Sequence, residues 1–199
     1  MDLGQRIGAL LISGSTIFLL LWKVAEFIRP GYSVSQEVIS RLGVGENAWV
    51  FNTSVILLGL FGIAAGYLLY RVDRVVSTLL LLSSLGAIGV GVFPMDNPVP
   101  HAISALAAFL FSGLAAIASV RMERGFLGWL WVVLGLISVS SLALFLLDID
   151  LGLGIGGIER MIVYPVMIWL YTFGAFLMIN KSVGVKGSNE PLHPHRGPS

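Results

Sequence analysis

The chain contains no cysteine and few charged residues. Of its 199 residues, 12% are Asp, Glu, Lys or Arg, and only three are His. The absence of Cys excludes disulfides, thiolate metal sites and a cysteine nucleophile. Soluble domains carry about 25% charged residues, so this composition is not typical of one. Long stretches of alternating polar and apolar residues are also missing, which argues against a membrane β-barrel.

What the chain has instead is a series of long apolar runs, with 56% of its residues hydrophobic. Runs of about 20 residues can cross a ~30 Å hydrocarbon core, and a helix satisfies its own backbone there. We therefore predict an all-α integral membrane protein, with one domain over residues 1–182 and a mobile cytoplasmic tail over 183–199. Six spans are expected, at about residues 5–28, 48–70, 75–93, 101–120, 126–147 and 158–180.

The distribution of charge predicts how the spans are oriented. Lys and Arg are enriched in the short cytoplasmic loops of membrane proteins. With six spans both termini lie on one side, and that side holds eight of the 12 Lys and Arg residues. The opposite side holds four cations and seven of the 11 acids. We therefore expect a multi-pass cell-membrane protein with both termini in the cytoplasm and an acidic outer side.

The connection between the first two spans has its own pattern. Arg29-Pro30-Gly31 ends the first helix, because proline restricts the residue before it. Ser33 and Gln36 then have the spacing of a capping box, and Glu37 and Arg41 that of an i,i+4 ion pair. These features predict a short amphipathic helix that lies at the membrane interface.

Two turns on the cytoplasmic side resemble each other. Arg71-Val72-Asp73-Arg74 and Arg121-Met122-Glu123-Arg124 lie 50 positions apart. The second and third spans could therefore duplicate the fourth and fifth. Tight turns between membrane helices share such features in any case, so duplication and coincidence both remain open.

Polar residues gather on the predicted outer side, at or just inside helix ends. Such residues face the bundle or water in membrane proteins. We expect an outward-facing polar pocket with eight candidate residues: Tyr32, Ser33, Asn52, Asp96, His101, Asp148, Glu159 and Arg160.

Structural roles are the alternative for the same residues. Asp96 would then be a turn residue, His101 would bond at the head of its helix, and Arg160 would pair with Asp96 or Asp148. Lys23 and Glu26, one turn apart in the first span, are expected to form a snorkelling pair. A metal held by His101 and nearby acids has no supporting ligand spacing, and the sequence names no cofactor.

Three groups of residues resemble the signatures of a known family. They are Gly31–Gly43 with Phe51-Asn52, then Gly91–Pro94 with His101, and finally Gly157–Arg160 with Tyr164-Pro165, Trp169 and Phe173-Gly174. They resemble the bacterial and archaeal membrane proteins catalogued as domain of unknown function 998, over Gly8 to Met178. Arg41 departs from the acidic residue expected there. The resemblance implies a polytopic membrane protein of uncharacterised function.

Three functions remain open at this point. The leading hypothesis is a non-catalytic protein that binds a small molecule, a lipid headgroup or a partner at the outer pocket. The second is an intramembrane enzyme acting on a lipid or lipid-linked substrate, with His101 and an acid within hydrogen-bond reach for general acid–base catalysis. The third is an accessory subunit of a larger membrane complex. The expected partners are membrane lipids and other membrane subunits or a second copy, and no nucleic-acid motif is present.

Overall fold

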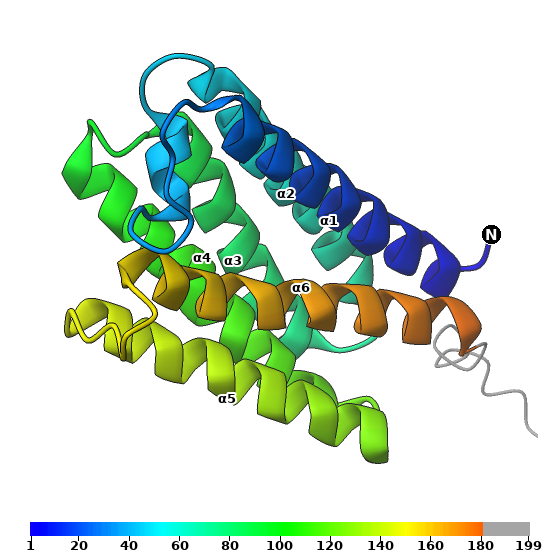
Figure 1. Ribbon diagram of the computed structural model, residues 1–199. Coiled ribbons are helices and arrows are strands. Elements are labelled where there is room, and N and C mark those ends of the chain that lie inside the picture. The colour runs from blue at the N-terminus through cyan, green and yellow to red at the C-terminus, as the bar shows by residue number, and fades with distance from the viewer. Residues whose placement is uncertain (181–199) are drawn as a thin grey trace, which may run out of the picture.

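The computed structural model describes residues 1–180, and its regular elements are all helical (Figure 1). The proposed tail over 183–199 lies outside the described residues. The elements are α1 (Leu3–Ile28), the 3₁₀ helix η1 (Ile39–Gly43), α2 (Ala48–Leu69), α3 (Arg74–Val92), α4 (Pro98–Ala118), the 3₁₀ helix η2 (Ser119–Arg121), α5 (Phe126–Leu146) and α6 (Ile155–Ile179).

The six long helices are each long and apolar enough to cross a membrane. The prediction of an all-α, multi-pass membrane protein with six spans is confirmed. Helix α4 begins at Pro98, three residues earlier than predicted, because a proline in the first turn lacks an N–H that would have no helical partner anyway. Helix α1 begins after Asp2, whose carboxylate accepts the Gln5 N–H at 2.8 Å in a capping box.

The long helices form a closed bundle. Each packs against the next along the chain, and α6 completes the bundle by packing against α1 and also touching α4. Helix α6 is the most buried span, with half of its apolar window buried against 28–44% in the others. This central position explains why polar residues near its start face protein rather than lipid.

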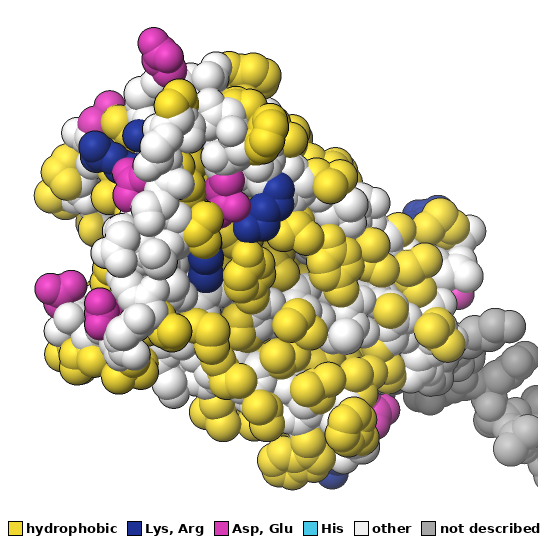
Figure 2. Space-filling view, in the orientation of Figure 1, with side chains coloured by type: hydrophobic (Ala, Val, Ile, Leu, Met, Phe, Trp, Pro, Cys, Tyr) yellow, Lys and Arg dark blue, Asp and Glu magenta, His cyan; other side chains and the backbone are white. Residues whose placement is uncertain are grey.

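The two ends of the bundle differ. The α1–α2, α3–α4 and α5–α6 connections lie at one end, which we call the polar end, and the chain start and the last turn of α6 lie at the other (Figure 1). Apolar side chains cover the flank of the bundle in Figure 2, while acidic and basic side chains gather at the polar end. This pattern fits a membrane-spanning flank.

Glycines let neighbouring helices approach closely. A Cβ on Gly8 in α1 would overlap the carbonyl oxygen of Gly174 in α6, and a Cβ on Gly4 would overlap that of Leu177. Membrane helices associate through van der Waals packing and hydrogen bonds rather than a hydrophobic driving force, so small residues are enriched where they meet. The α1–α6 contact that completes the bundle depends on this pair of glycines.

The amphipathic helix predicted between the first two spans does not form. Residues 34–36 make a turn, and only Ile39–Gly43 is helical, as a 3₁₀ helix with buried apolar side chains. Ser33 caps only a single turn: its hydroxyl accepts the Gln36 N–H and its own N–H donates to the Glu37 carboxylate at 3.1 Å. The extended backbone of Val38 (φ −64°, ψ 150°) then ends that turn before Ile39. None of the ion pairs within residues 1–180 joins Glu37 to Arg41, so the predicted pair is also wrong.

The two arginine-rich turns at the opposite end of the bundle touch. Asp73 caps α3 by accepting the N–H groups of Val75 at 2.9 Å and Val76 at 3.0 Å. The same carboxylate pairs with Arg121 of the other turn at 3.4 Å. This contact is consistent with either origin of the repeated turns, so duplication stays a prediction.

Candidate functional site

The α1–α2 connection folds against the start of α6 at the polar end. The Gly156 N–H donates to the Ser35 carbonyl oxygen at 3.0 Å. Gly154 has φ +74°, a conformation that glycine adopts without steric cost. A Cβ on Gly156 would overlap the Glu37 carbonyl oxygen, so the two segments are in backbone contact.

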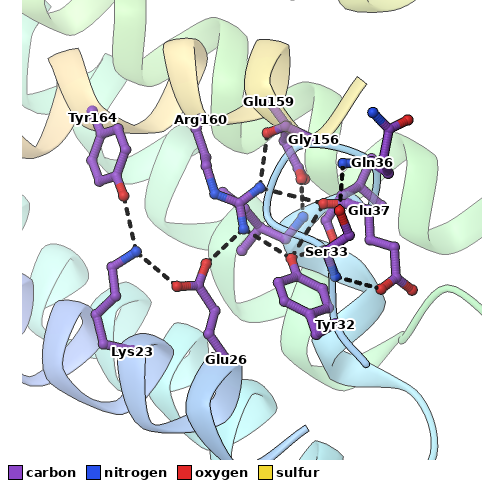
Figure 3. Close-up of polar contacts among 12 residues, drawn as sticks. Lys23, Glu26, Tyr32, Ser33, Gln36, Glu37, Gly156, Glu159, Arg160 and Tyr164 are labelled. Carbon is purple, nitrogen blue, oxygen red and sulfur yellow. Dashed lines mark hydrogen bonds and ion pairs between the residues drawn. The ribbon is translucent and has the colours of Figure 1, made fainter. Parts of the chain in front are cut away.

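Arg160 fastens this contact from the second turn of α6. Its side chain is buried, and its Nη2 lies 2.6 Å from the Glu26 carboxylate of α1 and 3.0 Å from the Tyr32 hydroxyl (Figure 3). Its Nη1 donates to the carbonyl oxygens of Gly156 at 2.9 Å and Glu37 at 3.3 Å. One guanidinium therefore holds together α1, the α1–α2 connection and α6.

Glu26 bridges two cations. Its second oxygen lies 2.8 Å from Lys23 Nζ, which confirms the predicted Lys23–Glu26 pair. Lys23 also donates to the Tyr164 hydroxyl at 2.9 Å and lies over the Trp22 ring. The predicted pairing of Arg160 with Asp96 or Asp148 is wrong, because Arg160 reaches across the α1–α6 contact rather than toward the α3–α4 and α5–α6 connections.

Tyr32 links the guanidinium to the connection itself. Its hydroxyl accepts from Arg160 and donates to the Val38 carbonyl oxygen at 3.0 Å. Burial disfavours the charged form and raises the pKa of Tyr32 above its ordinary value. The hydroxyl therefore stays protonated at neutral pH and remains a hydrogen-bond donor.

Glu159 faces a different part of the interior, because successive helical residues point about 100° apart. It is buried, with 2% of its surface exposed. Its carboxylate accepts the Ile39 N–H and the Ser40 hydroxyl, the latter at 3.0 Å. None of the ion pairs within residues 1–180 includes Glu159.

A cavity of about 90 Å³ lies inside the bundle, between α1, α2, α3, α4 and α6. Glu159 and Ser40 line it, and Glu159 is its one charged residue among those that the structure describes. Four serine hydroxyls on its wall donate to backbone carbonyls of the helices, which uses their O–H groups: Ser15, Ser83, Ser84 and Ser112. The rest of the wall is mostly apolar, and within residues 1–180 its one carboxylate is that of Glu159.

The remaining predicted residues do not join these two groups. Ser33 closes the turn in the α1–α2 connection. Asn52 donates from Nδ2 to the Gly43 carbonyl oxygen at 3.1 Å, while its buried Oδ1 has no partner within residues 1–180. Asp96 and Asp148 are exposed, in the α3–α4 and α5–α6 connections.

His101 lies in the first turn of α4, where its Nδ1 donates to the Phe93 carbonyl oxygen at 2.8 Å. No hydrogen bond or ion pair in the described part of the chain joins it to an acid, which is the geometry that the enzyme hypothesis required. Residues 1–180 also contain no group of three or more His, Cys, Asp or Glu placed to hold a metal.

Sequence reasoning missed the central role of Glu26. The pair with Lys23 was visible from its spacing, but the buried bond to Arg160 spans 134 positions. A usable signal was present, because an acid in one span and an arginine in another, near the same membrane face, are natural partners. The contribution of Ile39 and Ser40 left no such signal, since it arises from the fold of the connection.

One comparison with known proteins gives a match. A family model described as "Protein of unknown function (DUF998)" matches residues 12–175. The chain belongs to this family. No curated protein and no solved structure matches it. The matched region runs from α1 into α6 and includes the α1–α2 connection with Glu159 and Arg160, so the DUF998 family region contains the whole buried polar arrangement.

Proposed function

We propose that this DUF998 protein is a membrane-embedded binding protein whose ligand occupies the cavity beneath the α1–α2 connection. The observation that carries the proposal is the cavity itself. Protein interiors are close-packed and leave few voids larger than a water molecule. The cavity in this bundle measures about 90 Å³. Its walls come from five of the six spans, so the bundle as a whole shapes it.

The wall chemistry supports an apolar or amphiphilic ligand. Ligand pockets are mostly apolar with a few placed polar groups, and here these are Glu159 and Ser40 at one end. Water alone is a poor occupant for most of the cavity, because an ordered water needs two to four polar partners. A small molecule that partitions into the membrane fits both the walls and the surroundings.

Filling the cavity tests the proposal. Ala87 lines it, so Ala87→Leu would occupy part of the space, while Ala102→Leu on the exposed surface of α4 is a matched control. We expect native mass spectrometry of gently solubilised protein to find a bound small molecule on the wild type and on Ala102→Leu, and hexanol to raise the melting temperature of both.

The Ala87→Leu variant is expected to lose both effects. The proposal is overturned if hexanol stabilises no form of the protein and no small molecule co-purifies. A stoichiometric protein partner in the same spectra, without a small ligand, would favour the accessory-subunit role instead.

We further propose that the polar end faces the outside of the cell and that both termini are cytoplasmic, on the strength of the eight cations predicted at the opposite side. The chain has no Cys, so single cysteines can be placed without background. A membrane-impermeant maleimide should label Asp96→Cys in intact cells and Ser188→Cys only after the membrane is opened. The reverse pattern would invert the proposed orientation.

A further inference from the structure

We infer that the ligand of this cavity is a small organic cation whose ammonium group is held by Glu159. The inference rests on the proposed binding function and specifies its ligand class. Three features of the cavity carry it: a buried carboxylate without a cationic partner, the commitment of the nearest arginine elsewhere, and walls rich in aromatic rings.

The first feature is the state of the Glu159 carboxylate. Its two oxygens accept one hydrogen bond each, from the Ile39 N–H and the Ser40 hydroxyl. A carboxylate can accept about four, so this group retains acceptor capacity, and Glu159 lines the cavity. Within residues 1–180 no cation lies within the 4.0 Å of an ion pair with Glu159, and a cationic ligand would offset the cost of burying its charge.

The second feature explains why Arg160 does not fill this role. Its Nη2 is bonded to Glu26 and Tyr32, and its Nη1 to backbone carbonyls. Arg160 is not among the residues that line the cavity, whereas its neighbour Glu159 is. The two neighbours in sequence therefore differ in role. Arg160 binds other parts of the protein, and Glu159 lines the cavity.

The third feature is the aromatic character of the walls. Five aromatic side chains line the cavity: Phe18, Phe51, Phe61, Phe109 and Trp169. Aromatic faces attract cations electrostatically, and the effect is larger where water is excluded. The apolar remainder accommodates an alkyl group. An anion would be repelled by Glu159, and a neutral alcohol would gain only the apolar contacts.

Matched probes test the inference in purified protein at neutral pH. Hexylamine, hexanol and hexanoate share a chain and differ in the charge of the head. The affinity is obtained from the rise of melting temperature with probe concentration, since a ligand that binds the folded state stabilises it by mass action. We expect hexylamine to bind about tenfold more tightly than hexanol, the size of a charge-assisted hydrogen bond, and hexanoate to bind most weakly.

Two variants locate the effect. Glu159→Gln should bring the hexylamine and hexanol affinities together, whereas Asp148→Asn, which removes an exposed acid at the same end, should leave the tenfold preference intact. If Glu159→Gln does not fold, the order of the three probe affinities on the wild type still tests whether the ligand is a cation. Ala87→Leu should weaken all three.

The outcomes separate the inference from the proposed function. Equal binding of hexylamine and hexanol to the wild type, with loss of both in Ala87→Leu, would overturn the cation inference and leave the binding function standing. A preference for hexylamine that survives in Glu159→Gln would also overturn it. Absence of binding by any probe, together with no co-purifying small molecule, would overturn the binding function itself.

Discussion

Two groups of polar residues occupy the polar end, and they differ in what covers them. Arg160 and Glu159 lie under the α1–α2 connection and are 5% and 2% exposed. Asp96 and Asp148 lie in the α3–α4 and α5–α6 connections, and both are exposed among residues 1–180. Arg160 and Glu159 lie in the second turn of α6, whereas Asp96 and Asp148 lie in the connections, outside the helices. At this end of the bundle, the polar residues that join the buried arrangement are those over which the α1–α2 connection folds.

The covered group, Arg160 and Glu159, also joins different segments of the chain, whereas no hydrogen bond or ion pair within residues 1–180 involves the side chain of Asp96 or Asp148. Arg160 contacts Glu26 in α1 and two carbonyl oxygens, and Glu159 contacts two residues of the connection. Buried polar groups are costly to leave unpaired. Substitutions should accordingly have large effects in the covered group and small effects in the exposed one.

The largest expected effect is that of Arg160→Met. It would leave the Glu26 carboxylate with only the partly exposed Lys23 as a partner. Removing one partner of a buried ion pair costs about 3 kcal/mol of unfolding free energy. Titration with denaturing detergent in micelles measures the change.

A matched control and a second substitution sharpen this result. Arg41→Met removes an exposed arginine from the same connection and should change stability by less than about 0.5 kcal/mol. Adding Glu26→Gln to Arg160→Met should recover part of the loss, because the uncompensated charge is gone. Equal losses in Arg41→Met and Arg160→Met would contradict the distinction between covered and exposed groups.

An intermediate effect is expected for Gly156→Ala. The new Cβ would overlap the Glu37 carbonyl oxygen, so the α1–α2 connection would have to move, at a cost of about 2 kcal/mol. Gly157→Ala is the control, because its Cβ would press on the Cβ of exposed Leu153 at 2.9 Å, in the α5–α6 connection, and would meet no atom of the α1–α2 connection within 4 Å. Thermal unfolding of the two variants compares them. Similar stabilities would mean that the connection is not fixed against α6.

The smallest effect is expected for His101→Phe. The substitution removes one hydrogen bond, to the Phe93 carbonyl oxygen, which corresponds to about 1 kcal/mol. Because His101 does not line the cavity, hexylamine affinity should be unchanged. A large loss of that affinity at unchanged stability would place His101 in the binding site and restore the polar pocket predicted from the sequence.

Much of the architecture was predictable. The six spans follow from apolar runs whose length matches the membrane, and the Lys23–Glu26 pair follows from helical spacing. The structure of the α1–α2 connection was not predictable, because Ser33, Gln36 and Glu37 are compatible with both a capped helix and a single turn. The bonds of a capped first turn do form, from the Gln36 N–H to the Ser33 hydroxyl and from the Ser33 N–H to the Glu37 carboxylate, but Val38 is extended and no helix continues from them.

The sequence by itself determined the class of the protein, the number of its spans and the residues that are unusual in a membrane. These depend on composition and on local periodicity, which neighbouring residues carry. Only the tertiary structure decided which of the unusual residues meet. Glu26 and Arg160 become partners, and Glu159 comes to line a cavity, because α6 packs against α1 while the α1–α2 connection folds over both. Such contacts depend on which helices are neighbours and how they are rotated, and no local pattern encodes either.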